Sequence, residues 1–148
     1  MKKLLPPILL LLFITLMGLI CWTTDSPHLN SVPYVWLGLP FILLGLALSA
    51  AGKYLFKVRQ TNIMTFDEPD CLVTEGVFSF SRNPMYLGFS IIIWGSAVSM
   101  GAAWSSLGLA ILFVLITDRW YIEYEEKAMQ KKFGKRYHDY CQNVRRWI

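Results

Sequence analysis

Four apolar blocks without a charged residue at their centres constrain this chain more than any other feature. They cover about residues 4–22, 33–55, 85–100 and 104–118. A bilayer core about 30 Å thick needs about 20 apolar residues per helix, which the first two blocks supply and the last two approach. Charged residues make up only 16% of the chain, against about 25% in soluble domains. The sequence therefore predicts one all-α integral membrane domain over residues 1–148, with about four transmembrane helices and a cytosolic helical C-terminal extension.

The basic residues predict the orientation, because Lys and Arg accumulate in cytoplasmic loops. With four spans and a cytoplasmic N-terminus, all 14 Lys and Arg residues fall on the cytoplasmic side. A long polar loop, residues 57–82, and a tail, residues 119–148, then lie on that side too. We expect both termini to be cytoplasmic, and the compact size favours a bacterial inner membrane.

The first block has a second interpretation, because Lys2-Lys3 followed by an apolar run also begins a signal peptide. However, Cys21-Trp22-Thr23-Thr24 is a poor cleavage site, and the apolar run is longer than a usual signal core. We interpret the block as a retained span. Cleavage would leave three spans and change the predicted topology.

Glycines in the second block recur every seven residues, at Gly38, Gly45 and Gly52, and so share roughly one helix face. Small residues on one face allow membrane helices to approach closely. A helix that only tolerates glycine would show the same pattern. Close packing against a neighbouring span is the interpretation that we prefer.

The tail is predicted to begin as a continuation of the fourth span, through Asp118 and Arg119 to about Lys132, and to stop at Gly134. A last short helix then carries an apolar face among basic residues. The residues of this face are Tyr137, Tyr140, Cys141 and Val144. Such a composition suits a helix that lies on the membrane surface.

The boundary between the polar loop and the third block reads Ser81-Arg82-Asn83-Pro84-Met85-Tyr86-Leu87-Gly88. Asn83 can cap a helix, and Pro84 suits the first turn. A helix N-terminus carries unpaired N–H groups and partial positive charge, which suit an anionic ligand group. Capping alone would also explain the Asn-Pro pair.

Glu125-Glu126 follows the fourth block and also has two interpretations. Adjacent glutamates are common on a solvated helix surface, where Glu123 and Lys127 would pair at i,i+4. Carboxylates also accept hydrogen bonds from ribose hydroxyls and offset a cationic ligand.

Several other functions are disfavoured. No Asp, Glu, Lys or Arg lies in the middle of a span, which argues against ion-coupled transport. The three cysteines and two histidines lack metal-ligand spacing, so no metal site is predicted. The net charge of +4 is explained by the basic residues on the cytoplasmic side, which suit anionic lipid headgroups. Membrane lipids rather than nucleic acid are therefore the expected partners.

Two groups of motifs carry a resemblance to a known family. They are Leu72-Val73-Thr74-Glu75-Gly76-Val77-Phe78 with Ser81 to Gly88, and then Arg119, Glu125-Glu126, Phe133-Gly134, Tyr137, Tyr140 and Val144-Arg145-Arg146-Trp147. In order and spacing they resemble the isoprenylcysteine carboxyl methyltransferase and phospholipid methyltransferase superfamily. The resemblance covers roughly residues 61–148, and the first two spans match only in kind.

The resemblance implies S-adenosylmethionine as methyl donor, bound at the cytosolic ends of the last spans, and a lipophilic small molecule or lipid as acceptor. The donor-binding residues that it implies are Leu72, Val73, Phe78, Arg82, Asn83, Pro84, Met85, Tyr86, Glu125 and Glu126. Arg119 and Glu126 would face the acceptor as catalytic residues. Ile122 stands where eukaryotic carboxyl methyltransferases carry an Arg, a difference that concerns the acceptor more than the donor.

The acceptor class stays open between an isoprenylcysteine carboxylate-like group, a phospholipid amine, and a small thiol or carboxylate. One alternative is an NADPH-dependent membrane reductase of related architecture, although the chain is short for that and has no clear extra basic pocket for a 2′-phosphate. The other is a non-catalytic membrane subunit. Retention of Arg82 together with Glu125-Glu126 argues against it.

Overall fold

A computed structural model describes residues 5–23, 36–61 and 71–148. Within these ranges the chain is helical and contains no strand, which confirms the all-α prediction. The elements are α1 (Pro6–Thr23), α3 (Gly38–Val58), the 3₁₀-helix η1 (Gly76–Ser79), α4 (Pro84–Ser99), α5 (Trp104–Ile116), the π-helix η2 (Thr117–Ile122), α6 (Glu123–Phe133) and α7 (Lys135–Asn143).

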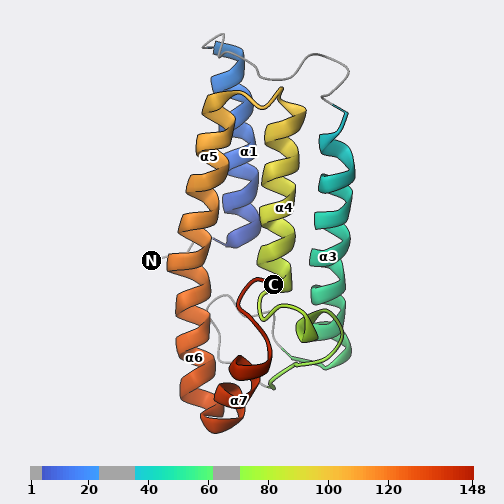
Figure 1. Ribbon diagram of the computed structural model, residues 1–148, viewed down its shortest axis with the longest axis vertical. Helices are drawn as coiled ribbons and strands as arrows, with labels where there is room; N and C mark the ends of the chain where they lie inside the picture. Colours follow the sequence, from blue (N-terminus) through green and yellow to red (C-terminus); the bar gives the residue numbers. More distant parts are fainter. Residues whose placement is uncertain (1–4, 24–35, 62–70) are drawn as a thin grey trace.

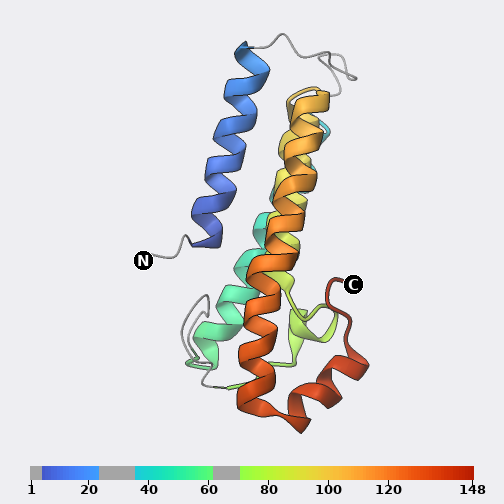
Figure 2. The ribbon, with the colours of Figure 1, turned by 90° about the vertical axis from the view of Figure 1, so that its left-hand side faces the viewer.

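The helices α1, α3, α4 and α5 form an up-and-down bundle in which consecutive helices run in opposite directions (Figure 1). The start of α1, the end of α3, the start of α4 and all of α6 therefore point toward the same end of the molecule (Figure 1). The short helix α7 turns back beneath this end (Figure 2). Segments of the loop and of the tail, which are far apart in the sequence, meet at this end. This agrees with the prediction that both lie on the same side of the membrane.

Three helices are long and apolar enough to cross a membrane: α1, α3 and the continuous helix Trp104–Phe133. Leu11, Leu43 and Leu44 point outward with more than half of their surface exposed, which suits a lipid environment. Helix α4 is apolar but has only 16 residues. The membrane prediction is thus supported, while the count of four spans stays a prediction.

The core lies between α1, α4 and α5, where Phe13, Met17, Ile93 and Phe113 are buried. The rings of Phe13 and Phe113 meet edge to face, with centroids 5.6 Å apart. Helix α1 is therefore packed against α4 and α5 and belongs to the bundle. The predicted starts of the first two spans, at residues 4 and 33, lie outside the described residues.

Close packing through glycine is confirmed between α3 and α4. A Cβ atom added to Gly45 would lie 2.5 Å from the carbonyl oxygen of Gly88, and one added to Gly52 would lie 2.8 Å from Met85 Cγ. Gly38 makes the same kind of contact with the far end of α4. Because no side chain separates the two backbones, this interface fixes the register of α3 against α4.

The fourth span continues into the tail as predicted, and Gly134 ends the helix with a φ of 51°. The sequence did not predict the π-helix η2, which joins α5 to α6. A π turn holds one more residue than an α turn, so it rotates the residues after it by about 100° relative to an uninterrupted α-helix. This rotation decides which side chains of α6 face the bundle end.

The loop predicted over residues 57–82 is more ordered than expected where it is described, while residues 62–70 lie outside the described residues. Helix α3 extends to Val58, and Arg59 pairs with Glu75 just before η1. Phe78 of η1 is buried against Phe56 of α3. The loop is thereby folded back onto the end of α3.

Candidate functional site

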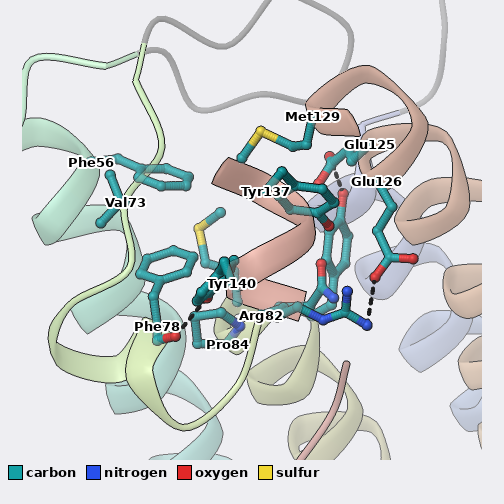
Figure 3. A pocket seen from close by; sticks show the side chains of 13 residues that line it. Phe56, Val73, Phe78, Arg82, Pro84, Glu125, Glu126, Met129, Tyr137 and Tyr140 are labelled. Atoms are coloured by element: carbon teal, nitrogen blue, oxygen red, sulfur yellow. Dashed lines mark hydrogen bonds and ion pairs between the residues drawn. The ribbon is translucent and has the colours of Figure 1, made fainter. Parts of the chain in front are cut away.

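A small pocket lies where the start of α4 meets the end of α3, η1, α6 and α7 (Figure 3). Its free volume is about 50 Å³. The lining residues are Phe56, Val73, Phe78, Arg82, Asn83, Pro84, Met85, Tyr86, Glu125, Glu126, Met129, Tyr137 and Tyr140. One side is aromatic and the other is acidic (Figure 3).

The aromatic side is built from α3 and η1. The rings of Phe56 and Phe78 stack with centroids 5.0 Å apart. The Tyr140 hydroxyl donates to the carbonyl oxygen of Phe78 at 2.6 Å and ties α7 to η1. Burial raises the pKa of the Tyr140 hydroxyl, so it stays protonated and able to donate at physiological pH. The resulting surface is flat and apolar, as a stacked heteroaromatic ring would require.

The acidic side is built from α6. Glu125 accepts a hydrogen bond from the Tyr86 hydroxyl at 2.6 Å. Glu126 lies 3.3 Å from the Arg82 guanidinium, and each of these two side chains is only 15% exposed. Arg82 also donates to the Cys141 sulfur, while its Nε is buried and has no acceptor among the described residues. The pocket thus contains two carboxylates and one unsatisfied cationic donor.

The C-terminal segment after α7 contacts two residues that line the pocket, Glu126 and Asn83. Arg146 donates to Glu126 at 2.5 Å and to both oxygens of Asp118 at 3.4 Å. The Trp147 indole donates to Asp118 at 2.9 Å. The hydrogen bond with Glu126 raises the pKa of Arg146, so this cation is retained at any working pH. Asp118, Glu126 and Arg82 are thereby joined in one network with the tail.

Asn83 stands at the N-cap of α4 and Pro84 at its first position, as predicted, but the Asn83 side chain makes no capping bond. Its amide instead donates to the carbonyl oxygen of Arg146 at 3.2 Å. The expected capping role is therefore wrong. The hydrogen bond to Arg146 orients the side chain toward the tail, while the backbone N–H of Asn83 donates to the Ser81 hydroxyl oxygen.

The structure brings most of the predicted donor-binding residues together. The residues that line the pocket as predicted are Val73, Phe78, Arg82, Asn83, Pro84, Met85, Tyr86, Glu125 and Glu126. Leu72 is partly buried next to Val73 in the sequence, but its side chain does not line the pocket.

Arg119 does not reach the pocket. Its side chain is 78% exposed and lies 3.4 Å from Asp118. In an uninterrupted α-helix, residues 119 and 126 would share a face, because seven residues make about two turns. The π turn between them breaks this relation. The arginines that pair with Glu126 are Arg82 and Arg146, and Arg146 was not among the predicted site residues.

Four lining residues were not predicted: Phe56, Met129, Tyr137 and Tyr140. The spacing of Tyr137 and Tyr140 was recognised as an apolar face, but it was expected to contact the membrane surface. Both are buried against the protein instead, at 5% and 9% exposure. The amphipathic pattern predicts that one face of the helix is covered, but it does not distinguish a membrane surface from the rest of the protein.

Comparison with known proteins gives a consistent result. The family model for phospholipid methyltransferase matches residues 33–136. Protein-S-isoprenylcysteine O-methyltransferase B of Arabidopsis thaliana is 35% identical over 118 residues, which is 72% of this chain and 55% of the relative. A probable protein-S-isoprenylcysteine O-methyltransferase of Oryza sativa subsp. japonica is 29% identical over 127 residues, covering 80% of this chain and 63% of the relative.

The chain therefore spans between about half and two thirds of the length of these plant relatives. An uncharacterized protein of Haemophilus influenzae is 36% identical over 64 residues, covering 43% of this chain and the whole of the relative. No solved structure matches.

Proposed function

Because the chain belongs to the phospholipid methyltransferase family, we propose that it transfers a methyl group from S-adenosylmethionine to a lipophilic acceptor in the membrane. The relatives named protein-S-isoprenylcysteine O-methyltransferase support the reaction class. The acceptor remains one of an isoprenylcysteine carboxylate-like group, a phospholipid amine, or a small thiol or carboxylate. The proposed setting is a bacterial inner membrane with both termini in the cytoplasm.

One observation carries the proposal. Residues that the family resemblance implies for donor binding lie in separate segments of the chain, yet most of them line a single pocket. Val73 and Phe78 come from the loop, Tyr86 from α4, and Glu125 and Glu126 from α6. A purely structural role for these residues gives no reason for them to converge.

The chemistry of the pocket fits the donor. Glu125 and Glu126 provide carboxylate oxygens for ribose hydroxyls and negative charge for a sulfonium. The stacked rings of Phe56 and Phe78 provide a face for adenine. The buried, unsatisfied Nε of Arg82 is a donor suited to the carboxylate of the methionine part.

The pocket is too small for the donor as it stands, because its free volume of about 50 Å³ is far below the roughly 300 Å³ or more of typical ligand pockets. Donor binding therefore requires side chains to move. The C-terminal cover, made of α7 and residues 144–148, is held by polar contacts, by tyrosine packing and by the packing of Trp147 against the core. We propose that it opens to admit the donor and closes afterwards.

S-Adenosylmethionine supplies a methyl group on a positively charged sulfur. The protein has to align the acceptor lone pair with the methyl–sulfur bond, and this positioning is its main catalytic contribution. Glu126 is held by Arg82 and Arg146, and Glu125 by Tyr86, so both carboxylates have fixed orientations.

The first test is calorimetric titration of the detergent-purified protein with S-adenosylmethionine and S-adenosylhomocysteine, with NADPH as control. We expect micromolar binding of both sulfur ligands and none of NADPH. Failure of both sulfur ligands to bind a folded protein would contradict the proposal. Transfer of labelled methyl to a membrane extract would then separate an enzyme from a non-catalytic subunit.

The reductase alternative gains no support from the family or the named relatives. Arg82 is the single basic residue among the described residues that line the pocket, and it is paired with Glu126.

A further inference from the structure

The most exposed tryptophans lie at the two ends of the apolar helices. The tryptophans with more than half of their surface exposed are Trp22, Trp36, Trp104 and Trp120. The first three belong to the end of α1, the turn before α3 and the start of α5, and these helix ends share one end of the bundle (Figure 1). Trp120 lies in η2, beyond the other end of α5. Tryptophan rings are enriched at both interfaces between a bilayer and water.

Packing contacts place Trp120 level with the start of α4. The Tyr86 hydroxyl donates to Glu125 at 2.6 Å, and the rings of Tyr86 and Tyr121 have centroids 6.4 Å apart. The turn that carries Trp120 therefore lies beside the first turns of α4. The apolar helix α4 begins at this level, whereas the charged helix α6 extends beyond it (Figure 1). A change from apolar to charged helix surface at one level is typical of a membrane interface.

Helix α3 presents a second aromatic ring at the same level. A Cβ atom added to Gly52 would lie 2.8 Å from Met85 Cγ, so this part of α3 also lies beside the start of α4. Tyr54 follows two residues later and is 66% exposed, and the Lys53 side chain is exposed as well. On η2, Arg119 stands next to the tryptophan and is 78% exposed. Two separate helices thus each present an exposed ring with an exposed cation beside it.

The distances along the helices agree with the thickness of one bilayer. Trp104 and Trp120 are about 24 Å apart along their helix, at about 1.5 Å per residue. Trp36 and Tyr54 are about 27 Å apart by the same measure. Helix α4, with 16 residues, is about 24 Å long. These lengths lie slightly below the roughly 30 Å of a typical hydrocarbon core, a difference that local thinning of a bilayer can absorb.

The two ends of the bundle differ in charge. No Lys or Arg occurs in residues 4–52 or 83–118, so the end with three tryptophans carries no basic residue. The end with Trp120 has Lys53 and Arg119 at its surface. Anionic lipids of the cytoplasmic leaflet attract Lys and Arg side chains near the membrane surface. The charge therefore favours an anionic leaflet at the Trp120 end.

We propose that Lys53, Tyr54, Arg119 and Trp120 form a contact surface for anionic phospholipid headgroups, and that the cytoplasmic membrane interface crosses the molecule at the start of α4. Arg119 is then a ligand of lipid phosphate, which accounts for a side chain that points away from the pocket. A guanidinium suits a phosphate because it can donate two parallel hydrogen bonds. The inference goes beyond the proposed methyltransferase function and does not depend on it.

The neighbouring carboxylate does not prevent this contact. Arg119 lies 3.4 Å from Asp118, but Asp118 also accepts hydrogen bonds from Arg146 and from the Trp147 indole. Asp118 therefore keeps two partners when Arg119 turns toward a phosphate. Because the Arg119 side chain is largely exposed, this rotation requires no change in the packed core.

The position of the interface is tested by tryptophan quenching in nanodiscs made with phospholipids brominated either near the headgroup or deep in the acyl chain. The contribution of Trp120 is the difference in emission between the wild type and Trp120→Phe. We expect shallow bromines to quench it more than deep bromines. Trp94 is the matched control, because it is 38% exposed and lies about 12 Å further along α4 than Tyr86. Its contribution, measured with Trp94→Phe, should show the opposite order. Quenching of Trp120 by neither lipid, or more by the deep bromines, would overturn the placement.

The headgroup is tested by quenching of Trp120 with brominated phosphatidylglycerol against brominated phosphatidylcholine at equal mole fraction. We expect phosphatidylglycerol to bind preferentially, and Arg119→Gln to reduce this preference about fivefold, the factor expected for one basic residue near an anionic surface. Arg136→Gln is the matched control, because Arg136 is exposed on α7, away from the proposed interface (Figure 2). Equal quenching by the two lipids, or an unchanged preference in Arg119→Gln, would overturn the assignment of Arg119. Neither measurement involves methyl transfer.

Discussion

The α3–α4 interface and the C-terminal cover hold this molecule together in opposite ways. Between α3 and α4 the backbones touch through Gly45 and Gly88, with no charged group involved. The cover is held largely by polar contacts, those of Arg146 to two carboxylates and that of the Tyr140 hydroxyl to the Phe78 carbonyl, and Trp147 packs against the core. The close-packed backbones of α3 and α4 have no alternative arrangement, whereas the polar groups of the cover can exchange one hydrogen-bond partner for another. The first region is suited to be a permanent scaffold, and the second to open for a ligand.

The largest expected effect comes from Gly45→Leu, which breaks the scaffold. The new side chain would meet the Gly88 carbonyl, and the helices would have to separate. We expect a loss of about 3 kcal/mol of stability, measured as a lower melting temperature in detergent. Gly108→Leu is the matched control, because nothing lies within 4 Å of a Cβ at Gly108. Equal melting temperatures for the two variants would remove the steric account of the interface.

The next effect concerns ligand binding without loss of the fold. Glu126→Gln and Arg82→Ala should each weaken S-adenosylmethionine binding by about tenfold or more, because each removes a charged partner from the pocket. Both variants should melt well above Gly45→Leu. Glu123→Gln is the control, since Glu123 lies on the same helix and pairs only with exposed Lys127. Wild-type affinity in both pocket variants would remove the site assignment.

A smaller effect is expected from Arg146→Ala, which releases the cover. Glu126 keeps Arg82 as a partner, so the bundle should stay intact while α7 opens more often. We expect amide hydrogen exchange in residues 135–143 to become about tenfold faster, which corresponds to about 1.4 kcal/mol of local stability. Arg145→Ala is the matched control, because Arg145 is exposed and its backbone carbonyl, which the substitution keeps, accepts the hydrogen bond from the Arg82 N–H. Identical exchange in the two variants would mean that the ion pairs do not hold the cover.

The smallest effect is expected from Arg119→Ala. The side chain is 78% exposed, and its ion pair within the described part of the chain is with Asp118, which keeps Arg146 and Trp147 as partners. Donor affinity and melting temperature should both match the wild type. A marked loss of methyl transfer in this variant would show that Arg119 acts on the acceptor, as its motif position first suggested.

The amino-acid sequence by itself determined the helices and much of the site. Apolar blocks predicted the bundle, the seven-residue glycine repeat predicted the close contact of α3, and Gly134 predicted the end of α6. These features are local or periodic, so they can be recognised in the sequence without knowing which element packs against each helix. The motif from Ser81 to Gly88 could likewise be placed at a helix start, since Pro84 fits few other positions.

Only the tertiary structure decided which charges meet. Any arginine suits any carboxylate, so residue type did not show that Arg146 would lie beside Glu126 while Arg119 would be exposed. The choice depended on a π turn that rotates α6 and on a tail that folds back over α4. Periodicity fixes the face on which a residue lies, but the element that covers this face is set by packing between distant parts of the chain.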